Sequence, residues 1–133
     1  MANPNIVSVA TISAGTLGFN VTASNDALIT APAEHVLKLI TILAANVDGT
    51  NSATLDLWLT GLGAITDSSG SSAATADAND ATVYICKSLT IPPGATVSIL
   101  EKSLYLVEAD VLNGVASAAS DIDLLVSFES IKD

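Results

Sequence analysis

The chain of 133 residues has the length of one domain and carries 14 acidic residues against four lysines and no arginine, for a formal net charge of −10 at pH 7. This charge repels phosphate backbones, and arginine is the side chain most used for bidentate contacts to bases, so nucleic acid is disfavoured as a direct partner. Half of the residues are hydrophobic, yet the longest apolar run, residues 36–45, contains Lys38 and is shorter than the roughly 20 residues of a membrane helix, so we expect no membrane partner.

Signals for secretion and for cysteine chemistry are both lacking in the sequence. The opening stretch MANPNIVSVATIS has no basic segment and carries Pro4 where the apolar core of a signal peptide would begin, so we expect no signal peptide. Cys86 is the only cysteine, which excludes an intrachain disulfide and a cysteine-based metal site. Stability is therefore expected to come from a packed core or from neighbouring subunits.

Apolar and polar residues alternate with a period of two along most of the chain, which predicts half-buried β-strands. In chain order, the first strands are expected at residues 7–13 and 17–23, with a weaker one near residues 28–30. Residues 31–46, APAEHVLKLITILAAN, fit two structures. Their β-branched residues favour a strand buried on both faces, which we predict, whereas the apolar stripe after Pro32 is typical of a helix and would make the fold α+β.

The next segment, residues 54–60, places the only tryptophan on a strand face opposite three leucines. The side chains predicted to point away from Leu55, Leu57 and Leu59 are those of Thr54, Asp56, Trp58 and Thr60. Two interpretations of Trp58 stay open. It packs beneath the loop at residues 66–81, or it lies in a subunit contact, where tryptophan is enriched because one ring buries a large area and keeps its N–H available.

Residues 66–81, TDSSGSSAATADANDA, are a low-complexity tract with no large side chains to bury, so we predict an exposed loop. Further strands are expected in the second half of the chain, at residues 82–91, 96–100, 104–107, 111–116 and 121–129. Pro93 and Gly94 predict a type II turn, and Asn113 with Gly114 predicts a tight hairpin turn.

Eight or nine short strands with Gly and Pro turns, and no alternation of strands with helices, predict an all-β fold. We expect a single domain over residues 1–133, built as an antiparallel two-sheet sandwich of the jelly-roll type with the exposed loop at residues 66–81.

No motif in the sequence marks a catalytic centre, so we predict no enzymatic activity and no cofactor. His35, the only histidine, lies at the edge of an apolar run and is interpreted as structural. Cys86 is predicted to be a buried, inert thiol; the alternative is an exposed thiol whose pKa Lys87 lowers.

Carboxylates occur in pairs and clusters that could in principle do acid–base or metal chemistry. The pairs with i, i+2 spacing are Glu108 with Asp110 and Asp121 with Asp123. We interpret these pairs as solvated strand edges. The acidic stretches at residues 67–80 and 119–123 raise the question of calcium, but neither has the register of a calcium loop, so we predict solvated loops and no metal site.

Three segments in the second half of the chain carry distinctive turn and strand motifs. The matching residues are Ile91, Pro92, Gly94, Ala95 and Thr96; then Lys102, Leu104, Tyr105, Leu106, Glu108, Asp110 and Leu112; then Ser127, Phe128, Glu129 and Ile131. In these segments the chain resembles a family of small virion structural proteins of tailed bacteriophages, particularly marine and cyanobacterial ones. It departs from the family pattern in the Ser/Ala tract after Ile65 and at Ala109, where the family often has glycine.

The resemblance implies a β-sandwich or jelly-roll module that assembles as a homotrimer on a virion. Such a module decorates or cements the capsid surface by binding the major capsid protein or another virion protein, and it is made in the host cytoplasm. The candidate interface residues are Asp56, Trp58, Thr60 and Tyr84. One alternative is a tail or fibre module that binds a host glycan through Trp58, Asp56 and Tyr84, and another is an unrelated β-sandwich with a small ligand.

Overall fold

The computed structural model describes residues 11–67, 69–75 and 82–132, and these residues form eleven β-strands and no helix. The strands are β1 (Thr11–Val21), β2 (Asp26–Thr30), β3 (His35–Asn46), β4 (Ala53–Thr60), β5 (Ala64–Thr66), β6 (Ser72–Thr75), β7 (Val83–Ile91), β8 (Thr96–Ser98), β9 (Leu104–Val107), β10 (Val111–Ala116) and β11 (Ile122–Lys132). The prediction of an all-β chain is therefore confirmed.

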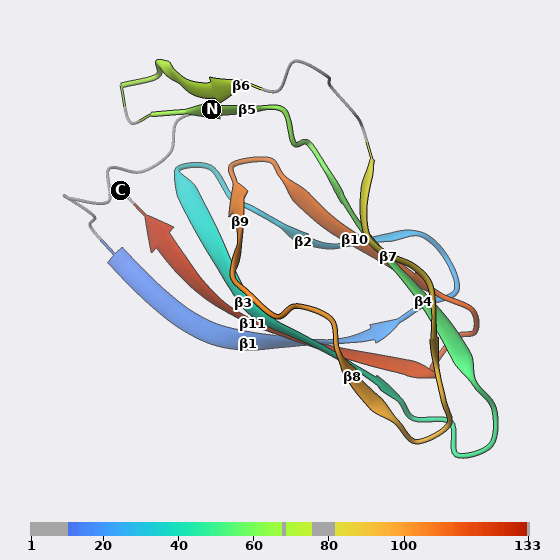
Figure 1. The fold of residues 1–133 in the computed structure, drawn as a ribbon. Coiled ribbons are helices and arrows are strands. Elements are labelled where there is room, and N and C mark those ends of the chain that lie inside the picture. Colours follow the sequence, from blue (N-terminus) through green and yellow to red (C-terminus); the bar gives the residue numbers. More distant parts are fainter. Residues whose placement is uncertain (1–10, 68, 76–81, 133) are drawn as a thin grey trace.

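The strands form two main sheets and one hairpin, all with antiparallel pairing (Figure 1). The first sheet has the order β1–β11–β3–β8, and β9 also pairs with β3. The second sheet has the order β2–β10–β4–β7, and β5 pairs with β6 in the separate hairpin. In Figure 1 the two main sheets face each other, and the hairpin lies at one end of them.

Period-two alternation builds one core between the two sheets. Leu55 and Leu57 of β4 are fully buried, as are Leu124 and Val126 of β11. All four belong to one apolar cluster that draws side chains from both sheets. Each central strand thus turns one row of side chains inward, as their sequences predict, and burial of these rows is the main favourable term in folding.

Residues 35–46 form strand β3, so the strand prediction is confirmed and the helical alternative is wrong. The strand pairs with β11 on one side and with β8 and β9 on the other. A bulge opposite Ser127 and Phe128 inserts Ile40 as an extra residue, which shifts the inward row from Leu39 to Ile42. The β-branched residues of this segment therefore serve a central strand rather than a helix.

The number of strands exceeds the eight or nine that the sequence predicts. The N-terminal strand is continuous over Thr11–Val21, and residues 7–10 of the predicted first strand lie outside the described residues. Two extra strands, β5 and β6, form a hairpin that enters the tract predicted to be a loop. All residues of β6 are exposed, so β6 is held by backbone hydrogen bonds to β5. For the same reason its sequence has no alternation of apolar and polar residues that would predict a strand. Residues 68 and 76–81 of that tract are outside the described residues.

The predicted tight turn at Asn113 and Gly114 is wrong, because both residues lie within strand β10. Gly114 serves close packing instead. A Cβ at this position would lie 2.9 Å from side-chain atoms of both Leu28 and Leu57. The glycine therefore lets two leucines of the core approach the β10 backbone.

Gly114→Ala is expected to lower the free energy of unfolding by about 1–3 kcal/mol, because the added methyl group overpacks the core. Gly15→Ala is the matched control, since a Cβ there meets nothing within 4 Å. This control should be neutral or stabilising by up to about 1 kcal/mol. Urea unfolding of both variants measures the difference, and equal effects at the two positions would contradict the close-packing role.

Asn46 is one of two buried polar side chains among the described residues, and it joins three segments of the chain. Its Nδ2 donates to the carbonyl oxygens of Asn51 and Ile91, each at 2.9 Å, and its Oδ1 accepts from the N–H of Asp48 at 3.0 Å. The end of β3 is thereby tied to the loop before β4 and to the end of β7. A buried amide with this many partners orders the loops at this end of the molecule.

Candidate functional site

The four candidate interface residues lie on or near the outer face of the second sheet. Asp56, Trp58 and Thr60 are half-buried on β4, while the leucines between them are buried in the core. Trp58 pairs in register with the exposed Tyr84 of β7, and their ring centroids are 5.8 Å apart at a tilt of 45°. The predicted faces of β4 are therefore correct, and Trp58 packs against Tyr84.

Asp56 is held by two groups from a bulge in β7. The Lys87 ammonium lies 2.6 Å from its Oδ2, and the N–H of Ser88 donates to its Oδ1 at 2.6 Å. Ser88 has a φ of 51°, a left-handed conformation that belongs to the irregular pairing of β4 and β7 at this point. The same ammonium lies 4.8 Å from the centroid of the Tyr84 ring, within the range of a cation–π contact.

Thr60 is connected to the other neighbour of β4. The Nδ2 of Asn113 on β10 donates to Thr60 Oγ1 at 3.1 Å and to the carbonyl oxygen of Trp58 at 3.4 Å. The candidate residues thus form one cluster that spans β10, β4 and β7. We call Asp56, Trp58, Tyr84 and Lys87 the aromatic cluster.

The two charged groups of the aromatic cluster, the Asp56 carboxylate and the Lys87 ammonium, neutralise each other. Burial raises the pKa of Asp56, but the hydrogen bonds from Lys87 and Ser88 outweigh it, so the pKa lies below its ordinary value of 3.8. The pKa of Lys87 is raised in turn by its hydrogen bond to Asp56. Both oxygens of Asp56 are engaged, which leaves Trp58 and Tyr84 as the main contact groups of the cluster.

Asp56→Asn tests the ion pair through its pH dependence. Because the pKa of Asp56 is lower in the folded than in the unfolded chain, its ionised form stabilises the fold above the unfolded-state pKa, and this stability is lost as the pH falls through the folded-state pKa. We expect the wild type to have the higher Tm at neutral pH and the gap to close below about pH 4. Lys87→Met is the control for the partner, and a gap that does not change with pH would contradict the pairing.

The sequence predicts two surroundings for Trp58, and one of them is the loop at residues 66–81. Residues 76–81 of that loop lie outside the described residues, so the interpretation of Trp58 as a residue beneath the loop stays a prediction. Its contact with Tyr84 is compatible with both interpretations.

The outer face of the first sheet has more exposed apolar surface than the sequence predicts. Ile12, Leu125 and Tyr105 expose 63%, 49% and 56% of their surface. The strand registers place Ile12 and Leu125 in two cross-strand rows with polar rows between them, and Tyr105 lies opposite Lys38 in one of the polar rows. The first row is Ile12, Ile131, Val36 and Val107, of which Val36 and Val107 are buried, and the second is Gly18, Leu125, Leu43 and Ser98. We call these two rows and the adjacent Tyr105 the apolar face.

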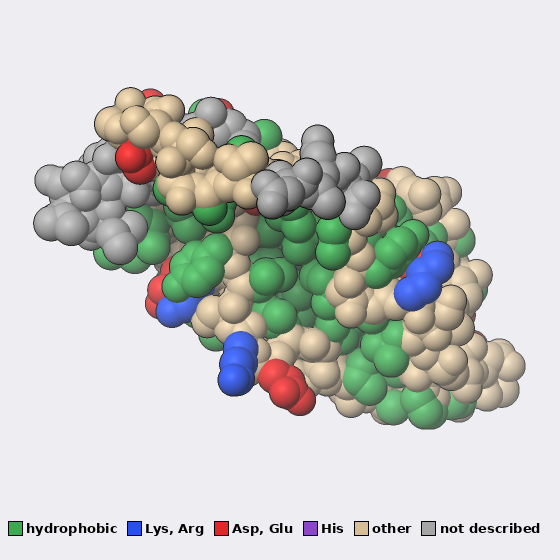
Figure 2. All heavy atoms as spheres, turned by 45° about the horizontal axis from the view of Figure 1, so that its top comes forward, with side chains coloured by type: hydrophobic (Ala, Val, Ile, Leu, Met, Phe, Trp, Pro, Cys, Tyr) green, Lys and Arg blue, Asp and Glu red, His purple; other side chains and the backbone are tan. Residues whose placement is uncertain are grey.

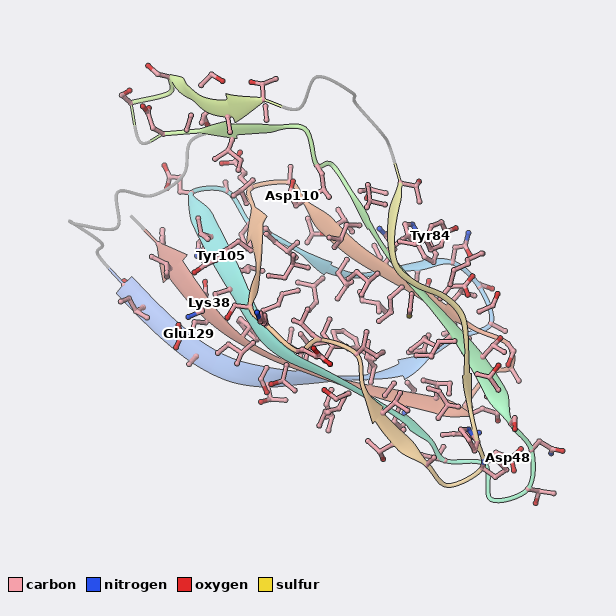
Figure 3. All side chains as sticks on the ribbon, viewed as in Figure 1. Lys38, Asp48, Tyr84, Tyr105, Asp110 and Glu129 are labelled. Carbon is pink, nitrogen blue, oxygen red and sulfur yellow. The ribbon has the colours of Figure 1, made fainter. Side chains whose placement is uncertain are left out.

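Polar residues separate the two apolar rows. Thr16 and Ser127 share a hydrogen bond of 3.0 Å between their hydroxyl groups, and Glu129 lies opposite Lys38, which in turn lies opposite Tyr105. Figure 3 shows Lys38, Glu129 and Tyr105 on this sheet, away from the core. Sequence reasoning missed this face, although Leu125 directly after the core residue Leu124 breaks the alternation and is the signal that could have found it.

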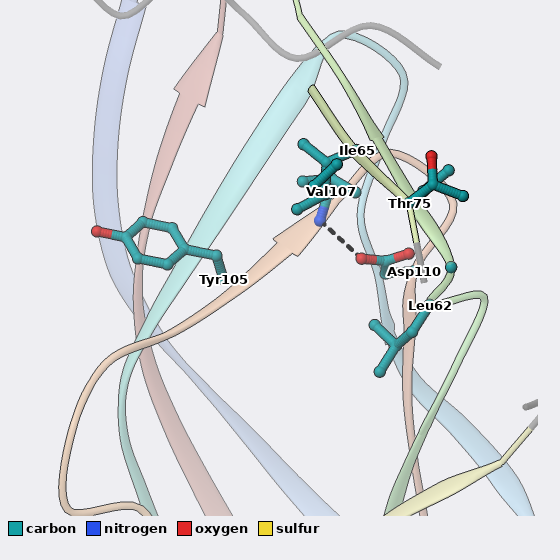
Figure 4. Close-up of a pocket in the computed structure, with 9 residues that line it drawn as sticks. Leu62, Ile65, Thr75, Tyr105, Val107 and Asp110 are labelled. Carbon is teal, nitrogen blue, oxygen red and sulfur yellow. Dashed lines mark hydrogen bonds between the residues drawn. The ribbon is translucent and has the colours of Figure 1, made fainter. Parts of the chain in front are cut away.

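Asp110 is buried, so its interpretation as part of a solvated carboxylate pair is wrong. Only 3% of its surface is exposed, and burial raises its pKa. It lines a cavity of about 330 Å³ between the hairpin β5–β6 and the end of β9 (Figure 4). The fold places it there because the turn after β9 bends inward, with Ala109 in a left-handed conformation at a φ of 72°.

The remaining chemical candidates are held in structural contacts. Burial raises the pKa of Cys86, whose Sγ lies 3.7 Å from the Leu55 carbonyl oxygen, so the inert-thiol interpretation is favoured over activation by Lys87. His35 Nδ1 lies 2.7 Å from the Ala33 carbonyl oxygen. Within residues 11–67, 69–75 and 82–132, no three His, Cys, Asp or Glu side chains gather as metal ligands would.

Comparisons with family models, curated proteins and solved structures found no match to this chain. In the described part of the chain, no helix has the length and apolar character to cross a membrane.

Proposed function

We propose that this chain is a non-enzymatic virion structural protein, a capsid decoration or cement protein of jelly-roll fold that assembles as a homotrimer. The observation that carries the proposal is the apolar face of the first sheet. Exposed apolar side chains that gather on one face beside polar residues are typical of protein–protein contacts, and Ile12, Tyr105 and Leu125 are such side chains. The proposal places this face in the contact between subunits.

The order of the strands supports the jelly roll. With the hairpin β5–β6 set aside and β8 and β9 counted as one interrupted strand, eight strand positions remain. Numbered along the chain, they give the orders 1-8-3-6 in the first sheet and 2-7-4-5 in the second. A jelly roll is likewise built from eight strands in two antiparallel sheets.

The charge and the motifs support a partner on the virion. In Figure 2 hydrophobic side chains gather in the middle of the visible face, and charged side chains lie toward its margins. A net charge of −10 favours a partner with a positively charged surface. The turn and strand motifs around Ile91, Tyr105 and Phe128 are those that resemble tailed-phage virion proteins, and the proposed partner is the major capsid protein or another virion protein.

The aromatic cluster provides a second contact surface on the other sheet. Trp58 and Tyr84 are residue types enriched in interfaces, and Lys87 and Asp56 neutralise each other beside them. The same exposed aromatic pair favours the alternative of a tail or fibre module that binds a host glycan. Because Asp56 is already engaged by Lys87 and Ser88, the protein contact is the stronger proposal.

Light scattering across a dilution series tests the trimer and its contact. We expect a mass near three times 13.4 kDa for the wild type and a shift to monomer for Leu125→Asp, because the aspartate charge would be buried in the contact. Thr90→Asp adds the same charge to an exposed position of the second sheet and should keep the trimer. Trp58→Ala should stay folded and weaken association less than Leu125→Asp. A wild type that is monomeric at every concentration would contradict the proposed contact.

Virions that lack this chain test the cementing role. A protein bound only to the assembled shell stabilises that shell by about 2.7 kcal/mol per site at a hundredfold excess over Kd. Virions without the chain should therefore lose infectivity at a lower temperature and in milder osmotic shock than complete ones. Equal resistance, together with reduced adsorption to host surface polysaccharide, would favour the tail module.

A further inference from the structure

Strand β1 forms one border of the first sheet, and only one of its two sides is paired in the part of the chain that the structure describes. It pairs with β11 over its full length, Thr11–Val21, and no other described strand pairs with it (Figure 1). The unpaired side of a border strand presents backbone N–H and C=O groups that can bind a further strand. At eleven residues, β1 is long enough for such pairing.

The other borders of the two main sheets carry features that protect a sheet edge from pairing. The pairing of β7 with β4 is irregular around Lys87 and Ser88. Strand β2 is five residues long and begins with Asp26, and the border opposite β1 is split into the short strands β8 and β9. Charges, bulges and short strands are the usual protections. Strand β1 has no charged residue, no proline and no shift of register against β11, so it lacks them all.

The inward row of β1 is incompletely covered. Leu17 belongs to this row, since it lies opposite the buried Val126, yet 42% of its surface is exposed. Gly15 of the same row lies opposite the half-buried Phe128, and a Cβ at Gly15 would meet nothing within 4 Å. A strand added beside β1 would therefore cover Leu17, and a large apolar side chain of that strand would fill the space above the glycine.

The outward side of β1 favours a positively charged neighbour. Ala14 lies opposite Glu129 of β11, and its methyl group is too short to shield that carboxylate from a strand beyond β1. Asn20 lies opposite Asp123, and its Nδ2 donates to Asp123 Oδ1 at 2.5 Å. A lysine or arginine on an added strand would extend over Ala14 toward Glu129, and the net charge of −10 adds to the attraction.

We propose that β1 is the docking site for an extended segment of another protein, which joins the first sheet as a further strand. The inward side chains of this segment are apolar, with a large one opposite Gly15, and its outward side chains include lysine or arginine. A second copy of β1 fits less well, because it brings no cation and adds another chain of charge −10. The inference rests on the proposed function for the source of the segment, which is another virion protein.

The test is a titration of the purified full chain with a peptide of about nine residues and blocked ends. In this peptide, valines and one phenylalanine alternate with threonines and two lysines. Alternate N–H groups of β1 point away from β11, so we expect them to exchange rapidly in the free protein and to become protected when the peptide binds. Hydrogen exchange followed by NMR measures this protection, and we expect a Kd on the order of 100 μM.

Two further peptides control for charge and for the alternation. The same peptide with glutamates in place of the lysines should bind at least about fivefold more weakly, because it meets the carboxylates of β11. A peptide of the original composition in which apolar and polar residues do not alternate should leave the exchange of the β1 amides unchanged, because it cannot turn one apolar row toward Leu17.

Leu17→Glu tests the edge itself. An inward-pointing charge protects a sheet edge, so this variant should bind the lysine peptide at least about tenfold more weakly, although it adds a charge that attracts lysine. Its exposed position favours retention of the fold, which the amide signals of the other strands report. Thr90→Glu is the matched control, since it adds the same charge to an exposed position of the second sheet and should keep the wild-type affinity.

Glu129→Gln tests the charge recognition. It should lower the preference for the lysine peptide over the glutamate peptide by at least about half, because it removes one of the two carboxylates beside β1. Glu101→Gln is the matched control. It removes the same charge from the exposed turn between β8 and β9, at the opposite border of the sheet, and should keep the full preference.

Protection of the alternate β1 amides without any peptide would overturn the proposal. Protection that is lost on dilution would assign the edge to a second copy, and protection at every concentration would assign it to another segment of the same chain. Absence of peptide binding, or full affinity in Leu17→Glu, would overturn it as well. These failures are distinguishable from failure of the proposed function, which shows itself in a monomeric mass or in unchanged resistance of virions that lack the chain.

Discussion

Burial of one side-chain row from each central strand, against the facing sheet, is the constraint on which the rest of this structure depends. Strands β3 and β11 supply one wall of the core, and β4 and β10 supply the other. The packing is close at Gly114, where an added Cβ would lie 2.9 Å from side-chain atoms of Leu28 and Leu57. Because the inward side chains fill the core, the outward side chains of the same strands remain available for contacts with other molecules.

The outer faces of the two sheets carry different kinds of side chains. The second sheet carries the aromatic cluster, in which Asp56 and Lys87 satisfy each other beside Trp58 and Tyr84. The first sheet leaves Ile12, Leu125 and Tyr105 largely exposed, with few charges between them. An apolar face of this kind gains more from contact with another protein than a self-satisfied ionic cluster does, since ion pairs at a surface contribute little.

The end of the molecule beneath the hairpin β5–β6 differs from both outer faces, because it contains a cavity. Loops and short hairpins at the ends of a two-sheet core can border space that the sheets do not fill, and here they border an open cavity that Asp110 helps to line. Asp110 closes the turn after β9 with one oxygen and presents the other without a partner.

By itself, the sequence determined the class of fold and the inward rows, because a period of two in apolar residues has one physical meaning when the chain is rich in β-branched residues and short turns. It determined the two faces of β4 for the same reason, and the β-branched residues of β3 favoured a strand there while a helix stayed open. Only the tertiary structure decided the bulge at Ile40, the hairpin β5–β6, the role of Gly114 and the burial of Asp110. The bulge, the role of Gly114 and the burial of Asp110 depend on contacts between residues far apart in the chain, such as Gly114 with Leu28 and Leu57, about which local periodicity carries no information. The hairpin β5–β6 is local, but its exposed strand β6 has no amphipathic pattern that would reveal it.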